Sequence, residues 1–255
     1  MVKLNNLDLK KIVETLLDSF LKAGKTAKEF SNKGVKITIK SDKTPVTDGD
    51  LAVDKILREK IKDLTPNIPI ISEETVNMSV KNKNKNFWLI DPIDGTRQYI
   101  NKGDEYTLNA ALIINLQPAA GIVYAPEKDR LFFSYGKDLA YEIHKGERKK
   151  LNCKKKKSKE IIGLTNSDIT SKEILDIYKK FNVTKTIKMS SSLKFCVLAA
   201  GEADIYAAQA RAYEWDIAAG HALLEHAGGK VLNHDEEIFS YGKENYKNPA
   251  IIAKT

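Results

Sequence analysis

The first clear pattern in the chain is a stripe of apolar residues that recurs every three or four positions near the N-terminus. It begins after Asp8, whose side chain can cap a helix, and continues to Leu21. This spacing predicts an amphipathic helix with one face in the core. The stripe consists of Leu9, Ile12, Val13, Leu16, Leu17, Phe20 and Leu21.

The next part of the chain changes from the helical period to the strand period and back. Residues 35–39 alternate apolar and polar side chains, which predicts a half-exposed strand, and a polar loop leads to a second amphipathic helix around 51–61. Residues 68–72 form a short apolar run that is typical of a strand. Successive strand-like runs joined by turns then predict an antiparallel meander over 107–114, 119–124, 131–134 and 139–144.

Beyond residue 160, short apolar runs alternate with helical stretches, and this alternation favours a second lobe of α/β type. Helices are expected over 171–181, over 192–200 and from about 213 to a closing pair, Gly228–Gly229. Strands are expected at 161–165, 186–189, 203–206, 231–232 and 250–253. We therefore predict an N-terminal α+β lobe over 1–150 and a C-terminal α/β lobe over 151–255.

The composition narrows the class of protein. A chain of 255 residues with 42% hydrophobic and 30% charged residues can bury a full core as an ordinary globular protein. The N-terminus lacks the apolar segment of a signal peptide, and polar residues interrupt the longest uncharged run, 106–126, so we expect no membrane span. Cys153 and Cys196 offer no disulfide framework or zinc site, which favours the cytoplasm.

The net charge of +8 is concentrated in one segment, residues 145–160, where nine Lys or Arg stand against two Glu. The rest of the chain is nearly balanced. Such a segment is more typical of a solvated connector than of a nucleic-acid surface, although it can also steer an anionic substrate. We expect no nucleic-acid partner, and the sequence does not decide whether the segment contacts a membrane.

The stretch most suggestive of chemistry is 88–96, Trp-Leu-Ile-Asp-Pro-Ile-Asp-Gly-Thr. An apolar run that suits a buried strand ends in Asp91 and Asp94, and Gly95 with Thr96 can turn the chain into a helix. Carboxylates at a strand end suit a hard cation such as Mg²⁺, and free amides at a helix start suit a phosphate. By itself the stretch could equally form a capped turn.

Further acids stand at the starts or ends of other predicted elements: Asp50, Glu73 and Asp216. Two of them have an ordinary explanation, because a carboxylate such as Asp50 in the first turn of a helix is favoured by about 0.3–1 kcal/mol and Asp216 suits a helix cap; Glu73 ends a short predicted strand. Taken singly, none of them indicates a metal site.

Taken together and in order, Glu73-Glu74, Asp91–Thr96 and Trp215–Gly220 resemble the inositol monophosphatase-like, Mg²⁺-dependent phosphatases over nearly the whole chain. The resemblance implies an α+β fold layered as an αβαβα sandwich, of the type found in inositol monophosphatase and fructose-1,6-bisphosphatase. An antiparallel-sheet lobe would be followed by a smaller mixed-sheet α/β lobe. Within this superfamily, Thr44–Asp50, Ser191–Cys196 and Glu214–Asp216 look like the CysQ-type 3'(2'),5'-bisphosphate nucleotidases.

The resemblance also implies a set of metal ligands. Glu73, Asp91 and the backbone carbonyl of Ile93 would hold one Mg²⁺, and a second would lie between Asp91, Asp94 and Asp216. A third, weaker ion would contact Asp50 through water. Four carboxylates without cations would repel one another, so ions must fill the site or the pKa values must rise.

Roles for the remaining residues follow from the same resemblance. Glu73 and Thr96, the latter oriented by Asp50, would serve the attack of water on phosphorus, with Thr96 relaying the proton. The amides of Gly95 and Thr96, together with Asp216, would bind the reacting part of the substrate, while Ser191 and Lys194 would bind the second phosphate or the ribose. From the helix pattern alone, Lys194 could instead face solvent.

The implied reaction is hydrolysis of adenosine 3',5'-bisphosphate to AMP and phosphate, with 3'-phosphoadenylyl sulfate as a second substrate, in sulfur metabolism and with sensitivity to lithium. One feature departs from the pattern: many relatives carry Pro-Arg where this chain has Ala207-Ala208, and Arg211 is the nearest arginine. An inositol-1-phosphate phosphatase and a non-enzymatic anion- or RNA-binding protein are the alternatives. A monomer and a homodimer are both compatible with the sequence.

Overall fold

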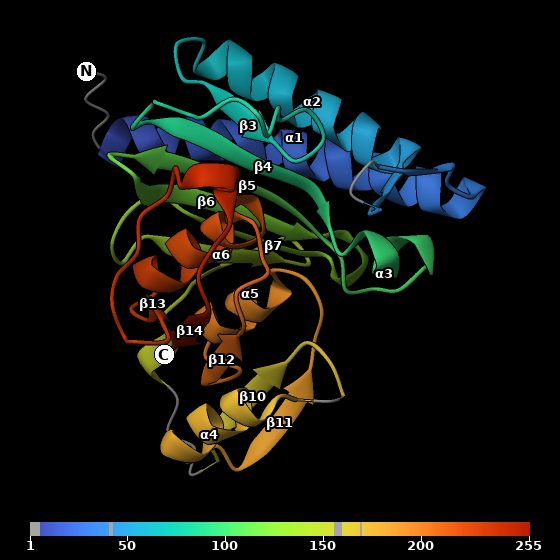
Figure 1. Cartoon of the computed structure of the whole chain (residues 1–255). Coiled ribbons are helices and arrows are strands. Elements are labelled where there is room, and N and C mark those ends of the chain that lie inside the picture. The colour runs from blue at the N-terminus through green and yellow to red at the C-terminus, as the bar shows by residue number, and fades with distance from the viewer. Residues whose placement is uncertain (1–5, 41–42, 156–159, 169) are drawn as a thin grey trace.

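The computed structural model describes residues 6–40, 43–155, 160–168 and 170–255. Its helices and sheets alternate in five layers (Figure 1). Helices α1 (Asn6–Lys33) and α2 (Asp48–Leu64) cover the outer face of a seven-stranded sheet, and α5 (Leu193–Ala199) and α6 (Glu214–His226) lie on its inner face. A five-stranded sheet follows, covered on its far face by α4 (Lys172–Lys180). The αβαβα sandwich is therefore confirmed.

The larger sheet has the strand order β3-β4-β5-β6-β7-β8-β9. From β4 onward every neighbouring pair is antiparallel, as the predicted meander requires, whereas β3 and β4 run parallel, so this lobe is not purely antiparallel. Its strands are β3 (Ile70–Ser72), β4 (Phe87–Asp94), β5 (Thr107–Ile114), β6 (Gln117–Ala125), β7 (Arg130–Ser134), β8 (Ala140–His144) and β9 (Glu147–Lys150).

The smaller sheet has the order β11-β10-β12-β14-β13. Strand β10 pairs in parallel with β11 and β12, and β14 pairs antiparallel with β12 and β13, which confirms a mixed sheet in the second lobe. Its strands are β10 (Ile162–Thr165), β11 (Lys185–Lys188), β12 (Ile205–Ala208), β13 (Lys230–Asn233) and β14 (Ile251–Lys254).

Alternation along β4 distributes its side chains between two cores. Phe87 and Leu89 belong to the core between the two sheets, whereas Trp88 and Ile90 belong to the core beneath α1 and α2. A strand buried on both faces must be apolar at every position, which explains the unbroken run that precedes Asp91.

Helix α6 lies unusually close to the larger sheet. A Cβ atom added at Gly121 on β6 would stand 2.4 Å from the backbone oxygen of Ala219 on α6, so only glycine permits this approach. The first turn of α6 is thereby held near the ends of the central strands. The helix belongs to the core shared by both sheets, so the predicted division at residue 150 separates the two sheets but not the packing between them.

Several predicted elements differ in detail. Part of the basic segment 145–160, predicted as a connector, forms the exposed edge strand β9, and residues 156–159 lie outside the described part of the chain. Strand β1 (Ile37–Ile39) pairs only with β2 (Pro45–Thr47) and is exposed along its length. No helix among the described residues has the length and apolar character needed to cross a bilayer.

Candidate active site

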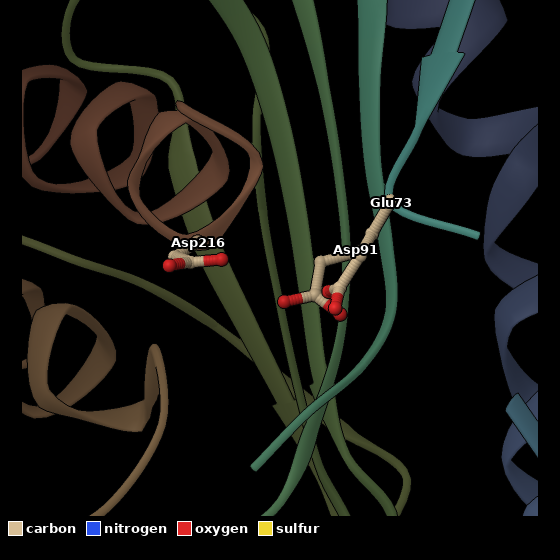
Figure 2. A group of neighbouring side chains, drawn as sticks. All are labelled: Glu73, Asp91 and Asp216. Atoms are coloured by element: carbon tan, nitrogen blue, oxygen red, sulfur yellow. The ribbon is translucent and has the colours of Figure 1, made fainter. Parts of the chain in front are cut away.

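Three acidic side chains from different elements meet where the central strands end. Glu73 follows β3, and its backbone N–H donates to the carbonyl of Ile90 at 3.0 Å, which fixes it beside β4. Asp91 lies in β4 and Asp216 in the first turn of α6. One carboxylate oxygen from each lies within 4.8 Å of the others, and Figure 2 shows Asp216 facing the adjacent side chains of Glu73 and Asp91. The structure thus brings these predicted ligands together.

The environment of Asp91 is what a cation site requires. The residue is 2% exposed, and its Oδ1 atom is buried without a hydrogen-bond partner among the described residues. Burial, followed by the negative charge of Glu73, raises the pKa of Asp91 well above its usual range, and burial with Asp94 does the same for Asp216. Closely spaced, desolvated carboxylate oxygens, in a group that holds no His or Cys among the described residues, fit a hard divalent cation such as Mg²⁺.

Asp94 lines the same cavity but is held from another direction. Its Oδ2 atom accepts hydrogen bonds from the backbone N–H of Ser192 at 2.5 Å and lies 2.9 Å from the Ser192 hydroxyl. Burial raises its pKa, while Lys194 and the Ser192 donors oppose this shift. A bulge between Asp91 and Asp94 ends the regular pairing with β5, so the strand continues through Asp94, farther than the sequence suggested.

Asp50 and Thr96, the predicted water-activating pair, have separate partners in the structure. Asp50 forms a reciprocal cap with Thr47: its Oδ2 accepts from the Thr47 N–H at 2.8 Å and from the Thr47 hydroxyl at 2.5 Å. The Thr96 hydroxyl donates to the carbonyl of Ile93 at 3.2 Å. Among the residues described, no hydrogen bond joins Asp50 to Thr96, so their joint role stays a prediction.

Asp50 nevertheless has an oxygen available for a further partner. Its Oδ1 atom is buried and unbonded within the described chain, and burial raises the pKa of the side chain to about 6. A carboxylate with this pKa can exchange a proton near neutral pH.

Gly95 and Thr96 form the predicted turn into a helix. Gly95 has φ +92°, a left-handed conformation that favours glycine, and α3 (Thr96–Ile100) begins directly after it. The helix has only five residues, so any phosphate bound here relies on individual amide groups rather than on a long helix dipole.

Lys40 contacts the acidic cluster in a way that the sequence did not reveal. Its Nζ atom lies 3.2 Å from Glu73 Oε1 and 2.8 Å from Glu74 Oε2. Burial raises the pKa of Glu74 to about 7 despite this neighbour. The only sequence signal was a lysine in the polar loop before Thr44-Pro45, where charged residues are ordinary.

One cavity of about 670 Å³ is lined both by acids and by a group of basic and aromatic residues. This group comprises Lys194, Arg211, Tyr206 and Tyr213, together with Ser191. Lys194 is buried, with Nζ 2.6 Å from the carbonyl of Ser191 and 5.0 Å from the centre of the Tyr206 ring. The interpretation of Lys194 as a solvent-facing residue is therefore wrong.

The ammonium group of Lys194 is poised to accept an anion. Burial lowers its pKa to about 8; Asp94 opposes this change, and the positive charge of Arg211 adds to it. An anion between Lys194 and Arg211 would relieve the repulsion between these two cations.

The two cysteines and His221 are buried and lie outside the lining of the cavity. Cys153 and Cys196 are buried, and His221 is buried with Nδ1 2.8 Å from the hydroxyl of Tyr241. None of these three residues lines the cavity.

Comparison with known proteins shows a consistent relationship. The model of the inositol monophosphatase family matches residues 8–255. The 3'(2'),5'-bisphosphate nucleotidase CysQ of Buchnera aphidicola is 36% identical over 218 residues, covering 85% of this chain and 79% of the relative. The protein of the same description from Escherichia coli K12 is 32% identical over 220 residues, covering 85% of this chain and 88% of the relative.

Solved structures agree with this relationship. CysQ from Bacteroides thetaiotaomicron has a TM-score of 0.76 and 28% identity, with 94% of this chain and 95% of that chain aligned. An IMPase/NADP phosphatase complexed with Mg²⁺ and phosphate has a TM-score of 0.77 at 18% identity, with 96% and 91% aligned. At that identity the second likeness concerns the fold alone.

Proposed function

The chain belongs to the inositol monophosphatase family, whose enzymes depend on metal ions, and from this premise we propose that it is a Mg²⁺-dependent 3'(2'),5'-bisphosphate nucleotidase. It hydrolyses adenosine 3',5'-bisphosphate to AMP and phosphate, and converts 3'-phosphoadenylyl sulfate to adenylyl sulfate in the same way. Named relatives with at least 30% identity over most of the chain support the enzyme class.

The observation that carries the substrate assignment is the division of charge within one cavity. A carboxylate cluster with bound cations can receive one phosphate, and Lys194 with Arg211 offers a separate cationic place for a second. A bisphosphate uses both places, whereas inositol-1-phosphate has one phosphate and would leave the cation pair unneutralised.

The residues of the cluster fit the implied ions. Glu73, Asp91 and the Ile93 carbonyl would hold one Mg²⁺, and Asp91, Asp94 and Asp216 would hold a second. Asp50 is the candidate contact for a third. When bound, Mg²⁺ supplies a more acidic water and neutralises charge on the phosphate and leaving oxygens.

The backbone and side chains around the phosphate then position it and transfer protons. The amides of Gly95 and Thr96 hold phosphate oxygens, while the Thr96 hydroxyl, after leaving the Ile93 carbonyl, takes part in proton transfer toward Asp50. Water oxygen bonds to phosphorus and gives up one proton toward Asp50, the bond from phosphorus to the ribose oxygen breaks, and that oxygen takes up a proton from solvent. No covalent link to the enzyme forms.

Arg211 is our candidate for the arginine that is missing at Ala208. It lies in the loop between β12 and α6 and lines the cavity, and its positive charge lowers the pKa of Lys194. Ala208 also lines the cavity but carries no charge. Ser191, also at the cavity wall, completes the proposed contacts to the second phosphate or the ribose.

A substrate panel with the full chain tests the proposal. Phosphate release from adenosine 3',5'-bisphosphate should require Mg²⁺ and exceed release from inositol-1-phosphate by at least about tenfold in kcat/KM, as the loss of one charged contact predicts. Preference for inositol-1-phosphate would instead identify the enzyme as an inositol-1-phosphate phosphatase. The double variant Lys149→Gln/Lys150→Gln, on the exposed strand β9, should leave hydrolysis unchanged. If the wild-type chain retains RNA in a salt-dependent way and this variant does not, the non-enzymatic alternative is favoured.

A further inference from the structure

Ser192, one residue beyond the predicted substrate contact Ser191, joins two acids that come from opposite lobes. It is 1% exposed and lies directly before α5. Its N–H and hydroxyl contact Asp94 Oδ2 at 2.5 Å and 2.9 Å, and its hydroxyl lies 2.5 Å from the backbone oxygen of Asp216. One small side chain thus touches the end of β4 and the first turn of α6.

The hydrogen bonds of Ser192 can be assigned from its neighbours. Asn109 Nδ2 donates to the hydroxyl oxygen at 3.1 Å, so that oxygen is an acceptor from β5. The single hydroxyl hydrogen faces two acceptors, Asp94 and the Asp216 carbonyl, and Asp94 already receives the N–H of Ser192. The shorter contact favours donation to Asp216. Ser192 therefore holds the Asp94 carboxylate with its backbone N–H and the Asp216 backbone carbonyl with its hydroxyl.

This arrangement opposes a specific repulsion. The negative charge of Asp94 raises the pKa of Asp216, and the two residues line the same cavity from different elements, β4 and α6. Without a connection between them, the two carboxylates would move apart whenever no cation lies between them. Neither Ser192 nor Asn109 lines the cavity, so both influence a ligand only through the residues they hold.

We propose that Ser192, supported by Asn109, is a positioning residue that fixes the spacing between Asp94 and Asp216 and so sets the affinity for the cation these acids share. The inference rests on the metal-binding part of the proposed function. It predicts that Ser192 affects one ion site selectively, because Glu73 and Asp91 are positioned by β3 and β4 without it.

The test uses Mn²⁺ alone as probe, with free Mn²⁺ measured by electron paramagnetic resonance and binding heats by calorimetry on the full chain. Ser192→Ala should weaken the site that includes Asp94 and Asp216 about 10–100-fold, the range typical when a residue orienting a metal ligand is lost. The other site should stay within about twofold. Ser192→Thr, which keeps the hydroxyl, should regain most of the affinity. Ser134→Ala is the matched control, since Ser134 is equally buried on β7 with no hydroxyl partner in the described chain.

Three results would overturn the inference. The first is that Ser192→Ala binds Mn²⁺ with unchanged affinity. The second is that it weakens both sites equally and lowers the Tm, which would show a general packing role. The third is that Ser192→Thr folds normally and yet fails to regain affinity. If Ser192→Ala does not fold, Asn109→Ala decides, with the same selective loss expected at smaller size. A wild-type chain that binds no Mn²⁺ would instead refute the proposed function.

Discussion

The acidic and the basic residues that line the cavity are held in different ways. The acids Glu73 and Asp91 follow or belong to neighbouring strands whose register fixes their spacing, and Asp91 is almost fully buried. Among the basic residues, Lys194 is carried by the seven-residue helix α5, and Arg211 is an exposed side chain in a loop. The spacing of these two acids is thus set by the sheet backbone, whereas the proposed substrate contacts Lys194 and Arg211 come from a short helix and a loop.

The sharpest way to test this contrast is Asp91→Asn, a change of charge at nearly constant volume. Loss of the proposed shared ligand should lower hydrolysis of every substrate by about 10³-fold or more, because stabilisation by the ions is worth several kcal/mol. The Tm of the metal-free protein should rise, since one of several repelling carboxylates is removed.

Phosphate release and thermal melting with and without Mg²⁺ measure both effects. Asp104→Asn, which alters an exposed acid paired with Lys128, is the matched control and should change neither. Substantial activity in Asp91→Asn would remove Asp91 from the metal site.

A smaller effect is expected for the basic residues. Lys194→Met keeps most of the side-chain length but removes the charge, so KM for adenosine 3',5'-bisphosphate should rise about 10–100-fold, the value of one or two charge-assisted hydrogen bonds. Arg211→Met should act in the same direction but less, because its side chain is exposed. Steady-state kinetics on the bisphosphate and on inositol-1-phosphate separate the two groups of residues. Equal losses on both substrates would contradict the separation.

The smallest effect concerns stability without metal. Burial raises the pKa of Asp50 to about 6 and of Glu74 to about 7, above their values in an unfolded chain. The folded state then binds more protons than the unfolded one, so the stability gained at low pH is lost as pH rises through this range. The Tm of the metal-free protein should fall by a few °C between pH 5 and pH 7.5.

Mg²⁺ should reduce this fall, because a cation favours the charged carboxylates. Differential scanning fluorimetry across pH gives the measurement, and Glu74→Gln should flatten the profile without metal. A Tm that rises over the same interval would show that these acids are stabilised in their charged form.

The acidic residues were largely predictable from the sequence. The run Phe87–Ile90 is apolar at every position because β4 is buried on both faces. Such a run predicts a buried strand, and Asp91 follows it directly. Strand β5 coincides with the predicted 107–114, although the polar residues Thr107 and Asn109 interrupt its apolar run. Asp216 was recognised only through resemblance, because a cap and a metal ligand look alike at a helix start.

The features that were missed depend on contacts between distant segments. Strand β9 consists of charged, exposed residues and exists through its pairing with β8, so periodicity carries no trace of it. Ser192 and Asn109 are polar residues within otherwise ordinary elements, and their roles appear only when β5, α5 and α6 are side by side. Lys40 reaches Glu73 and Glu74 across a loop whose folding has no sequence signature.

The position of Asp216 on α6 has a consequence for synthesis of the protein. The strands that carry Glu73 and Asp91 leave the ribosome first and can pair locally, whereas α6 emerges much later and packs onto β6 over Gly121. A nascent first lobe therefore lacks Asp216, one of the three clustered acids. Under the proposed assignment, tight capture of metal and phosphatase activity begin only after α6 has docked, whereas the core is completed by β13 and β14, which follow α6 in the chain.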